Sequence, residues 1–162
     1  YANYASDLSR TVPVNGRFTP RQKEVYNAVL RVQKAAIQLL RPGTLLDDYN
    51  KEVGKLMENE LVRLRLLDAD AVRKQDEDKP LYKKYFMHGA SHHLGLNVHD
   101  YGNKYRSFEA GMVFTCEPGI YIKDEGFGIR IENDILITDK GPEDLMKNIP
   151  VEAEEIEALM AV

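Results

Sequence analysis

The stretch from Met87 to Asp100, which reads MHGASHHLGLNVHD, most constrains this chain because it holds all four of its histidines. Histidine readily ligates metals and moves protons near neutral pH. In an extended backbone, residues an even number apart share a face, so the stretch predicts one pair of histidines on each side: His88 with His92, and His93 with His99. A histidine-rich surface loop, or buried core histidines with hydrogen-bond partners, is the alternative interpretation.

The first 14 residues alternate roughly between polar and apolar side chains and are rich in Tyr, Val and Thr. This pattern predicts a strand that the dipeptide Asn15-Gly16 closes as a turn. Asp7 lies inside the predicted strand. A carboxylate in a strand interior is unfavourable unless it is exposed, paired or bound to a metal. An exposed edge position remains open for it.

Two more carboxylates belong to predicted strands further along the chain. An apolar run from Gly111 ends at Glu117, directly before a Pro-Gly dipeptide. The run 126–138 is typical of one long strand, and it carries Arg130 and Glu132 two residues apart. Residues at that spacing lie on the same face of a strand.

The strand positions therefore predict one cluster of charged and imidazole side chains, made of Asp7, His92, Glu117 and Glu132. Isolated buried charges cost several kcal/mol each, so such a sheet would need a compensating cation. Carboxylate oxygens with one imidazole suit manganese, cobalt or zinc, and carboxylates can also bridge two ions that activate water. A metal site is the interpretation that these residues favour.

Helical periodicity marks the scaffold around this cluster. The tetrapeptide Thr19-Pro20-Arg21-Gln22 predicts a helix start, with an apolar face that continues to Leu40. A second helix is predicted from Thr44 to Leu64, and a closing helix over 150–160. The charge-rich segment 68–80 is interpreted as a solvated loop or frayed helix end, although its KQDEDK run could hold a cation.

Composition limits the classes of function that this chain can have. Its 162 residues suit one domain or a large part of one, and the net charge is −4. The absence of a basic run argues against nucleic-acid binding, and the apolar runs are too short to span a membrane. The single cysteine, Cys116, excludes an internal disulfide and is compatible with a reducing compartment.

Four motifs together resemble those of a known enzyme family. SDLSRTVPVNG, MHGASHHLGLNVHD, CEPGIYI and GIRIEND, in that order, are similar to motifs of the pita-bread-fold metallopeptidases, and among these most to the Xaa-Pro aminopeptidases (aminopeptidase P). The resemblance implies an α+β pita-bread (creatinase/methionine aminopeptidase-like) fold, in which helices cover a curved, mostly antiparallel sheet. It also implies that residues 1–162 are a partial catalytic domain, without the amino-terminal domain and the first part of the catalytic domain.

The same resemblance implies a set of metal ligands. The family holds two divalent ions, usually Mn²⁺ with Co²⁺ or Zn²⁺ as alternatives, by two aspartates, one histidine and two glutamates. The matching residues are Asp7 and Glu132 as bridging ligands, with His92 and Glu117. The family's other aspartate would precede residue 1. We therefore expect the chain by itself to bind about one ion at most and to be inactive or nearly so.

The activity that the resemblance implies is hydrolysis of the amino-terminal Xaa-Pro bond by a metal-bridging hydroxide. Glu117 would move a proton towards the proline nitrogen, His88 and His99 would contact the substrate, and Arg130 would orient the ligands. His93 is expected in the pocket wall. Tyr121 is left open between a site residue and a packed strand tyrosine.

The expected partners are peptides with proline at the second position, in a cytoplasmic enzyme whose full-length form is a homo-oligomer. Three alternatives remain. Xaa-Pro dipeptidase (prolidase) shares the ligand set, although Ser91 before the metal-ligating histidine favours the aminopeptidase. Methionine aminopeptidase shares the fold, but its residues around the histidines match less well. A non-catalytic pita-bread module that binds peptides or proteins would be expected to lose ligands that this chain keeps.

Overall fold

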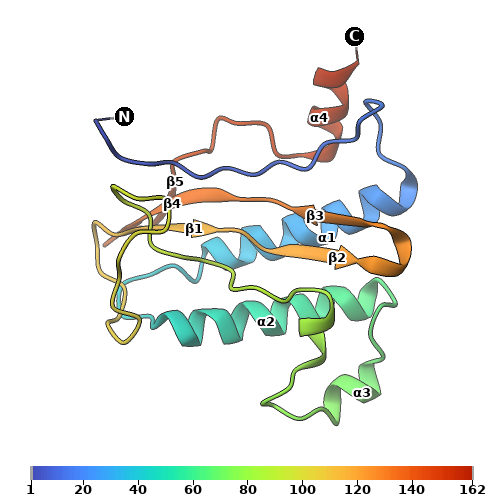
Figure 1. The fold of residues 1–162 in the computed structure, drawn as a ribbon, viewed down its shortest axis with the longest axis horizontal. Helices are drawn as coiled ribbons and strands as arrows, with labels where there is room; N and C mark the ends of the chain where they lie inside the picture. Colours follow the sequence, from blue (N-terminus) through green and yellow to red (C-terminus); the bar gives the residue numbers. More distant parts are fainter. Residues whose placement is uncertain (1, 162) are drawn as a thin grey trace.

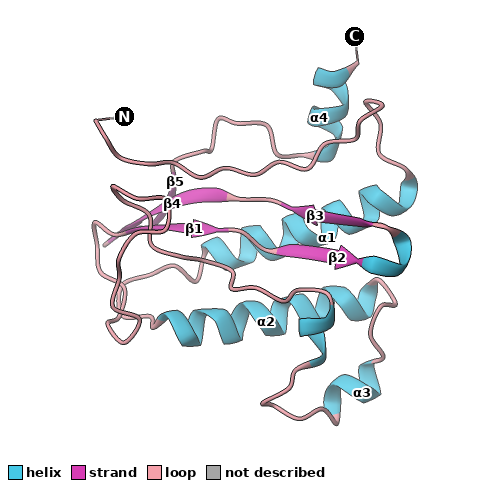
Figure 2. Ribbon diagram, in the orientation of Figure 1, coloured by secondary structure: helices cyan, strands magenta, loops and turns pink. Residues whose placement is uncertain are grey.

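The computed structural model describes residues 2–161 and confirms the α+β class (Figure 1). Helices α1 and α2 lie along one side of antiparallel strands, and the extended amino-terminal segment runs along β4 and β3 (Figures 1 and 2). The helical elements are α1 (Pro20–Ile37), α2 (Leu46–Arg63), α3 (Ala69–Arg73), α4 (Ala153–Met160) and the 3₁₀ turns η1 (Leu81–Lys84) and η2 (Lys123–Glu125). The strands are β1 (Val113–Cys116), β2 (Gly119–Ile122), β3 (Phe127–Arg130), β4 (Asn133–Thr138) and β5 (Gly141–Asp144).

Helix α1 begins as the sequence predicts. Thr19 and Gln22 form a reciprocal cap, because the Thr19 hydroxyl accepts from the Gln22 N–H and the Gln22 side chain accepts from the Thr19 N–H. The helix ends at Ile37, earlier than expected. From Gln38 to Leu40 each N–H bonds to a carbonyl three residues back, so the chain tightens into turns before Pro42.

Helix α2 begins two residues later than predicted. Leu45 occupies the N-cap position, whereas the Thr44 hydroxyl donates to the Leu39 carbonyl. Asp47 and Asp48 lie in the first turn, where their charges complement the positive end of the helix dipole. The segment 68–80 is largely the solvated connection that was expected, with the short helix α3, of which no described residue is buried.

The strands form two antiparallel units within the described residues, one in the order β1-β4-β5 and one as the hairpin β2-β3. Their inner faces pack on α1 and α2 through fully buried side chains such as Val29, Tyr49, Phe114 and Ile135. This core fixes the strands from which the candidate site projects. Within residues 2–161, none of the helices has the length and apolar character that a membrane crossing requires.

The prediction of one long strand over 126–138 is wrong. Strand β3 ends at Arg130 and β4 begins at Asn133, while on the other side β1 ends at Cys116 and β2 begins at Gly119. The registers place these two interruptions opposite each other. Proline causes part of the break, because Pro118 has no N–H to donate and only its carbonyl is used, as an acceptor for Ile131.

The prediction of a strand over residues 1–14 is also wrong for the part that the structure describes, and residue 1 lies outside it. Ala2 and Asn3 form a turn with positive φ, and from there to Pro13 the only ladder contact within the described residues is the isolated bridge between Ser9 and Glu132. Neighbouring backbone groups bond to side chains instead: the Asp7 N–H donates to Asp134, and the Arg130 N–H donates to the Thr11 hydroxyl. The predicted turn at Asn15-Gly16 is confirmed.

The histidine stretch is a loop that runs beside β1 and then folds back. The carbonyl of His92 accepts from Thr115 in β1, and His93 forms an isolated bridge with Phe114. The chain then reverses, so that the Asp100 N–H donates to the His93 carbonyl. Because this reversal ends the alternation, the predicted grouping of His93 with His99 is wrong.

Candidate metal centre

The predicted site residues converge on one open pocket of about 460 Å³. It is lined by side chains from the amino-terminal segment, the histidine loop and the two strand interruptions: Asp7, His88, Gly89, Ser91, His92, His99, Glu117, Arg130 and Glu132. All seven residues that the sequence proposes for the site are among them. Segments that lie more than 100 residues apart in sequence therefore meet here.

Three of the four predicted ligands form a compact group. One ligand atom from each of Asp7, His92 and Glu132 lies within 4.8 Å of the other two. His92 Nε2 lies 3.6 Å from Asp7 Oδ2 and 3.6 Å from Glu117 Oε1. These separations are too long for hydrogen bonds. They resemble the spacing of about 3.4 Å between two ligand atoms that are each about 2.1 Å from a tetrahedral ion.

The two glutamates occupy the opposed interruptions of the sheet. Glu117 follows β1 and Glu132 precedes β4, so both side chains leave the backbone where the regular ladder is absent. The Glu117 N–H donates to the Ala90 carbonyl, and the Glu132 N–H donates to the Ser9 carbonyl. These two hydrogen bonds hold Glu117 beside the histidine loop, which carries His92, and Glu132 beside the amino-terminal segment, which carries Asp7.

Hydrogen bonding defines which nitrogen of His92 faces the carboxylates. His92 Nδ1 lies 2.9 Å from the His93 carbonyl oxygen. A carbonyl can only accept, so Nδ1 carries the proton and Nε2 of the neutral ring keeps its lone pair. Nε2 is the atom directed at Asp7 and Glu117. A backbone carbonyl that holds a ring nitrogen in this way is the usual support of a metal-ligating histidine.

The charges of the pocket favour a bound cation. Glu132 is 1% exposed, and burial, with the neighbouring charges of Glu117 and Asp7, raises the pKa of Glu132 above its ordinary value. Burial also raises the pKa of Asp134, which accepts the Asp7 N–H, to about 6. Crowded carboxylates of this kind are stabilised by a positive ion. The donor set, oxygens with one imidazole nitrogen, fits a divalent metal.

Comparison with known proteins identifies the family. The family model described as Metallopeptidase family M24 matches residues 1–139. The chain belongs to this family. The Escherichia coli K12 Xaa-Pro aminopeptidase is 44% identical over 174 aligned residues, which cover 99% of this chain and 38% of that protein. The human Xaa-Pro aminopeptidase 3 is 37% identical over 167 residues, covering 96% of this chain and 32% of that protein.

Solved structures of aminopeptidases share the fold. Aminopeptidase PepP of Pseudomonas aeruginosa superposes with a TM-score of 0.86 at 39% identity, covering 99% of this chain and 39% of that one. Zinc-substituted E. coli aminopeptidase P in complex with product gives a TM-score of 0.84 at 43% identity, covering 99% of this chain and 39% of that one. The resemblance and the pita-bread fold are therefore confirmed, for a chain that spans less than half the length of these relatives.

Two further histidines, His88 and His99, line the same pocket. His99 is exposed and stacks on His92, with ring centroids 4.1 Å apart. His88 Nδ1 donates to the Gly89 carbonyl, and His88 Nε2 lies 2.8 Å from the Tyr121 hydroxyl. Because His88 Nδ1 carries the proton, Nε2 of the neutral ring accepts from the Tyr121 hydroxyl. Burial raises the pKa of Tyr121, which keeps this hydroxyl protonated. Tyr121, which the sequence left open, therefore contacts a pocket residue.

His93 is not in the pocket wall, contrary to expectation. Its ring packs against Phe114, with ring centroids 4.1 Å apart, and burial lowers the pKa of His93. The pocket-lining residues do not include it. His93 is a packing residue.

Sequence reasoning missed the polar residues that support the ligands. Thr115 is fully buried, and its hydroxyl accepts from the His92 N–H and lies 3.4 Å from Glu117 Oε1. The carboxylate of Asp134 accepts the N–H of Asp7. The available signals were positional: Thr115 lies two residues before the predicted ligand Glu117, and Asp134 lies two residues after the predicted ligand Glu132.

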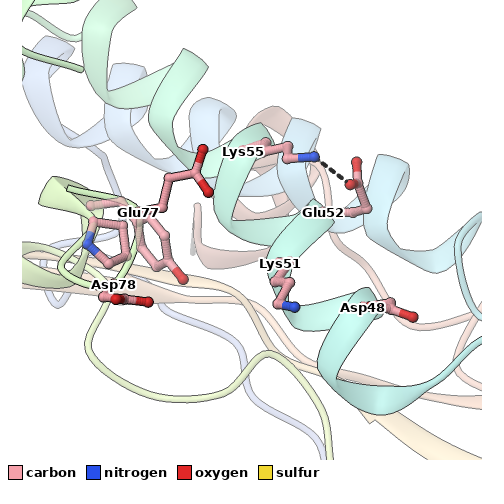
Figure 3. A pocket seen from close by; sticks show the side chains of 8 residues that line it. Asp48, Lys51, Glu52, Lys55, Glu77 and Asp78 are labelled. Atoms are coloured by element: carbon pink, nitrogen blue, oxygen red, sulfur yellow. Dashed lines mark hydrogen bonds and ion pairs between the residues drawn. The ribbon is translucent and has the colours of Figure 1, made fainter. Parts of the chain in front are cut away.

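Part of the charge-rich KQDEDK run lines a second groove, between α2 and the loop before η1 (Figure 3). Glu77 and Asp78 of that run line it with charges of both signs from α2: Asp48, Lys51, Glu52 and Lys55. Lys55 pairs with Glu52 at 2.6 Å. Among the described residues, the group of side chains that could hold a metal ion is Asp7, His92 and Glu132, and the groove has no such group. The structure therefore supports the solvated interpretation of the run.

Proposed function

We propose that this chain is the metal-binding part of an M24 aminopeptidase that hydrolyses the amino-terminal Xaa-Pro bond of peptides. One observation carries the proposal: Asp7, His92, Glu117 and Glu132, which match the family's ligands, line a single pocket. The named relatives are Xaa-Pro aminopeptidases, which supports proline as the second residue of the substrate. Because the chain spans 38% of the E. coli relative, the activity is proposed for the whole protein.

The proposed cofactor is a divalent ion, with Mn²⁺ as the first candidate and Co²⁺ or Zn²⁺ as alternatives. The crowded carboxylates and Nε2 of His92, which lies 3.6 Å from Asp7 and from Glu117, fit such an ion. A zinc-substituted relative has been solved, which supports divalent metals in the family. Ions bound here would polarise the substrate carbonyl and lower the pKa of water. The full protein is proposed to hold two of them, and this chain about one.

The remaining pocket residues have distinct proposed roles. Glu117 is proposed to accept a proton from the attacking water and to deliver it to the proline nitrogen as the peptide bond breaks. Its side chain is 14% exposed and lies beside His92, so it can face both the ligands and a substrate. His99 and His88 are proposed to hydrogen-bond the substrate from the two sides of the ligand group. Arg130, whose side chain is 45% exposed, is proposed to orient Glu132.

Two other functions remain as alternatives. A dipeptidase would use the same ligands but accept only Xaa-Pro dipeptides. A non-catalytic binding module would not need four intact ligands, which is why we prefer an enzyme. Homo-oligomerisation of the whole protein and a cytoplasmic location also remain predictions.

The test compares a tripeptide Xaa-Pro-Yaa with the dipeptide Xaa-Pro, in the presence of Mn²⁺, for the full-length protein and for its His92→Ala variant. We expect release of the first residue from the tripeptide only, and loss of that activity in the variant. Cleavage of the dipeptide alone would identify a dipeptidase, and binding without cleavage would identify a binding module. The 162-residue chain is assayed beside them, since robust cleavage by it would overturn the expectation that it is inactive.

A further inference from the structure

The hydroxyl of Ser9 lies between Arg130 and Glu132. Ser9 Oγ is 2.6 Å from Glu132 Oε2, and it is 2.9 Å from Arg130 Nη2 and 3.2 Å from Arg130 Nε. The direct separation between Arg130 Nε and Glu132 Oε2 is 3.9 Å, which is too long for a hydrogen bond. The guanidinium therefore reaches the buried carboxylate through the serine hydroxyl.

The direction of these hydrogen bonds is determined by the groups involved. A guanidinium can only donate, so Ser9 Oγ accepts from both Arg130 nitrogens. A hydroxyl has two acceptor lone pairs and one proton, and the carboxylate can only accept, so that proton goes to Glu132. Every hydrogen-bonding site of the Ser9 hydroxyl is then used. Its orientation, and that of the carboxylate oxygen which it contacts, is defined.

The backbone of Ser9 is held in place independently of its hydroxyl. The Glu132 N–H donates to the Ser9 carbonyl at 3.1 Å, which forms the isolated bridge between the two segments. Arg10 Nη1 donates to the carbonyls of both Ser9 and Glu132, at 2.9 Å each. Removal of the hydroxyl alone should therefore leave the two segments together.

We propose that Ser9 is a positioning residue for Glu132, which fixes the carboxylate in the orientation that binds the metal and couples it to Arg130. The inference rests on the proposed metal centre. Glu132 Oε2 gives one lone pair to Ser9, and the other lone pairs of the carboxylate remain available for the ion. Without the hydroxyl, Glu132 would lose the bond that holds its terminal torsion, and metal affinity would fall, as it does when the supporting partner of a ligand is removed.

The test measures the dissociation constant of Mn²⁺ by titration calorimetry for the 162-residue chain and three variants. Ser9→Ala removes the hydroxyl, and Ser9→Thr keeps it. Thr11→Ala is the matched control, because among the described residues the Thr11 hydroxyl hydrogen-bonds to the backbone of Arg130 alone, accepting from its N–H and donating to its carbonyl. The unfolding temperature of each metal-free chain is recorded beside the affinity.

We expect Ser9→Ala to weaken Mn²⁺ binding by about 10- to 100-fold. Ser9→Thr and Thr11→Ala should stay within about twofold of the wild type. Unchanged affinity in Ser9→Ala would overturn the inference. Equal losses of Mn²⁺ affinity in Ser9→Ala and Ser9→Thr would also overturn it. If Ser9→Ala lowers the unfolding temperature but leaves the Mn²⁺ affinity unchanged, the hydroxyl only stabilises the fold, and the inference is again overturned. No Mn²⁺ binding by the wild-type chain would instead contradict the proposed metal centre, and this inference with it.

Discussion

Replacement of Glu132 by glutamine should make the metal-free chain more stable while it destroys the metal site. The substitution keeps the size of the side chain, and its amide oxygen can still accept from Ser9. The substitution removes one of the negative charges that lie close together in the pocket. The stability of the metal-free chain and its response to metal should therefore change in opposite directions.

The magnitude follows from the geometry of the pocket. Ligand oxygens of Asp7 and Glu132 lie within 4.8 Å of each other. Two like charges at that distance repel by roughly 0.9 kcal/mol at the dielectric constant of water and by roughly 3.5 kcal/mol at an effective value of 20. The Asp7 side chain is 27% exposed, so solvent screens part of this repulsion. We expect Glu132→Gln to raise the free energy of unfolding by about 1 to 2 kcal/mol, or the unfolding temperature by about 2–8 °C.

The assay is thermal unfolding at pH 7, first with a chelator and then with Mn²⁺ at about 100 times its dissociation constant. Ligand at that concentration stabilises the wild type by about 2.7 kcal/mol. The variant should gain nothing, so the order of stability should reverse between the two conditions. Glu143→Gln is the control, because Glu143 is exposed and pairs only loosely with Lys147, 3.9 Å away. It should change the stability by less than about 0.5 kcal/mol. A variant that is less stable than the wild type in chelator, or that keeps the full response to Mn²⁺, would refute the reasoning.

Two further predictions concern the scaffold. Tyr26 is fully buried and donates to the Val151 carbonyl, and burial raises its pKa to about 12. The unfolded tyrosine ionises near pH 10, so this residue should cost the wild type up to about 2 to 3 kcal/mol of stability as the pH rises from 10 to 12. Tyr26→Phe should be about 1 kcal/mol less stable at pH 7, and denaturant titrations should show that deficit shrinking above pH 10; a deficit independent of pH would contradict this. Thr19→Ala should remove the reciprocal cap with Gln22 and lower the unfolding temperature by about 2–4 °C, whereas Thr19→Ser should not; equal loss in both variants would argue against the cap.

The sequence predicted which residues would meet in one pocket better than it predicted the secondary structure around that pocket. Glu117 could be recognised because a carboxylate directly before Pro-Gly ends a strand, and that is local information. The break between β3 and β4 could not be recognised in the same way. Ile131 continues a β-branched, apolar run, and the interruption arises in part from Pro118, which lies opposite it between β1 and β2. Secondary-structure propensity depends on neighbours in sequence, so it does not reveal the effect of a proline that lies opposite in space.

Long-range contacts account for the other differences. The reversal that stacks His99 on His92 depends on the bond from Asp100 to the His93 carbonyl, which no periodicity indicates. Ser9 and Glu132 are 123 residues apart, and only their meeting gives the serine a role. A supporting hydroxyl has no sequence signature of its own until its partner is known.

The central claim is that Asp7, His92, Glu117 and Glu132 form a metal site, and a count of bound metal tests it most directly. The 162-residue chain and its His92→Ala variant are dialysed against Mn²⁺, freed of unbound ion, and analysed for manganese per chain. The account predicts one tightly bound ion in the wild type and none in the variant. No bound ion in the wild type, or the same count in both chains, would contradict it.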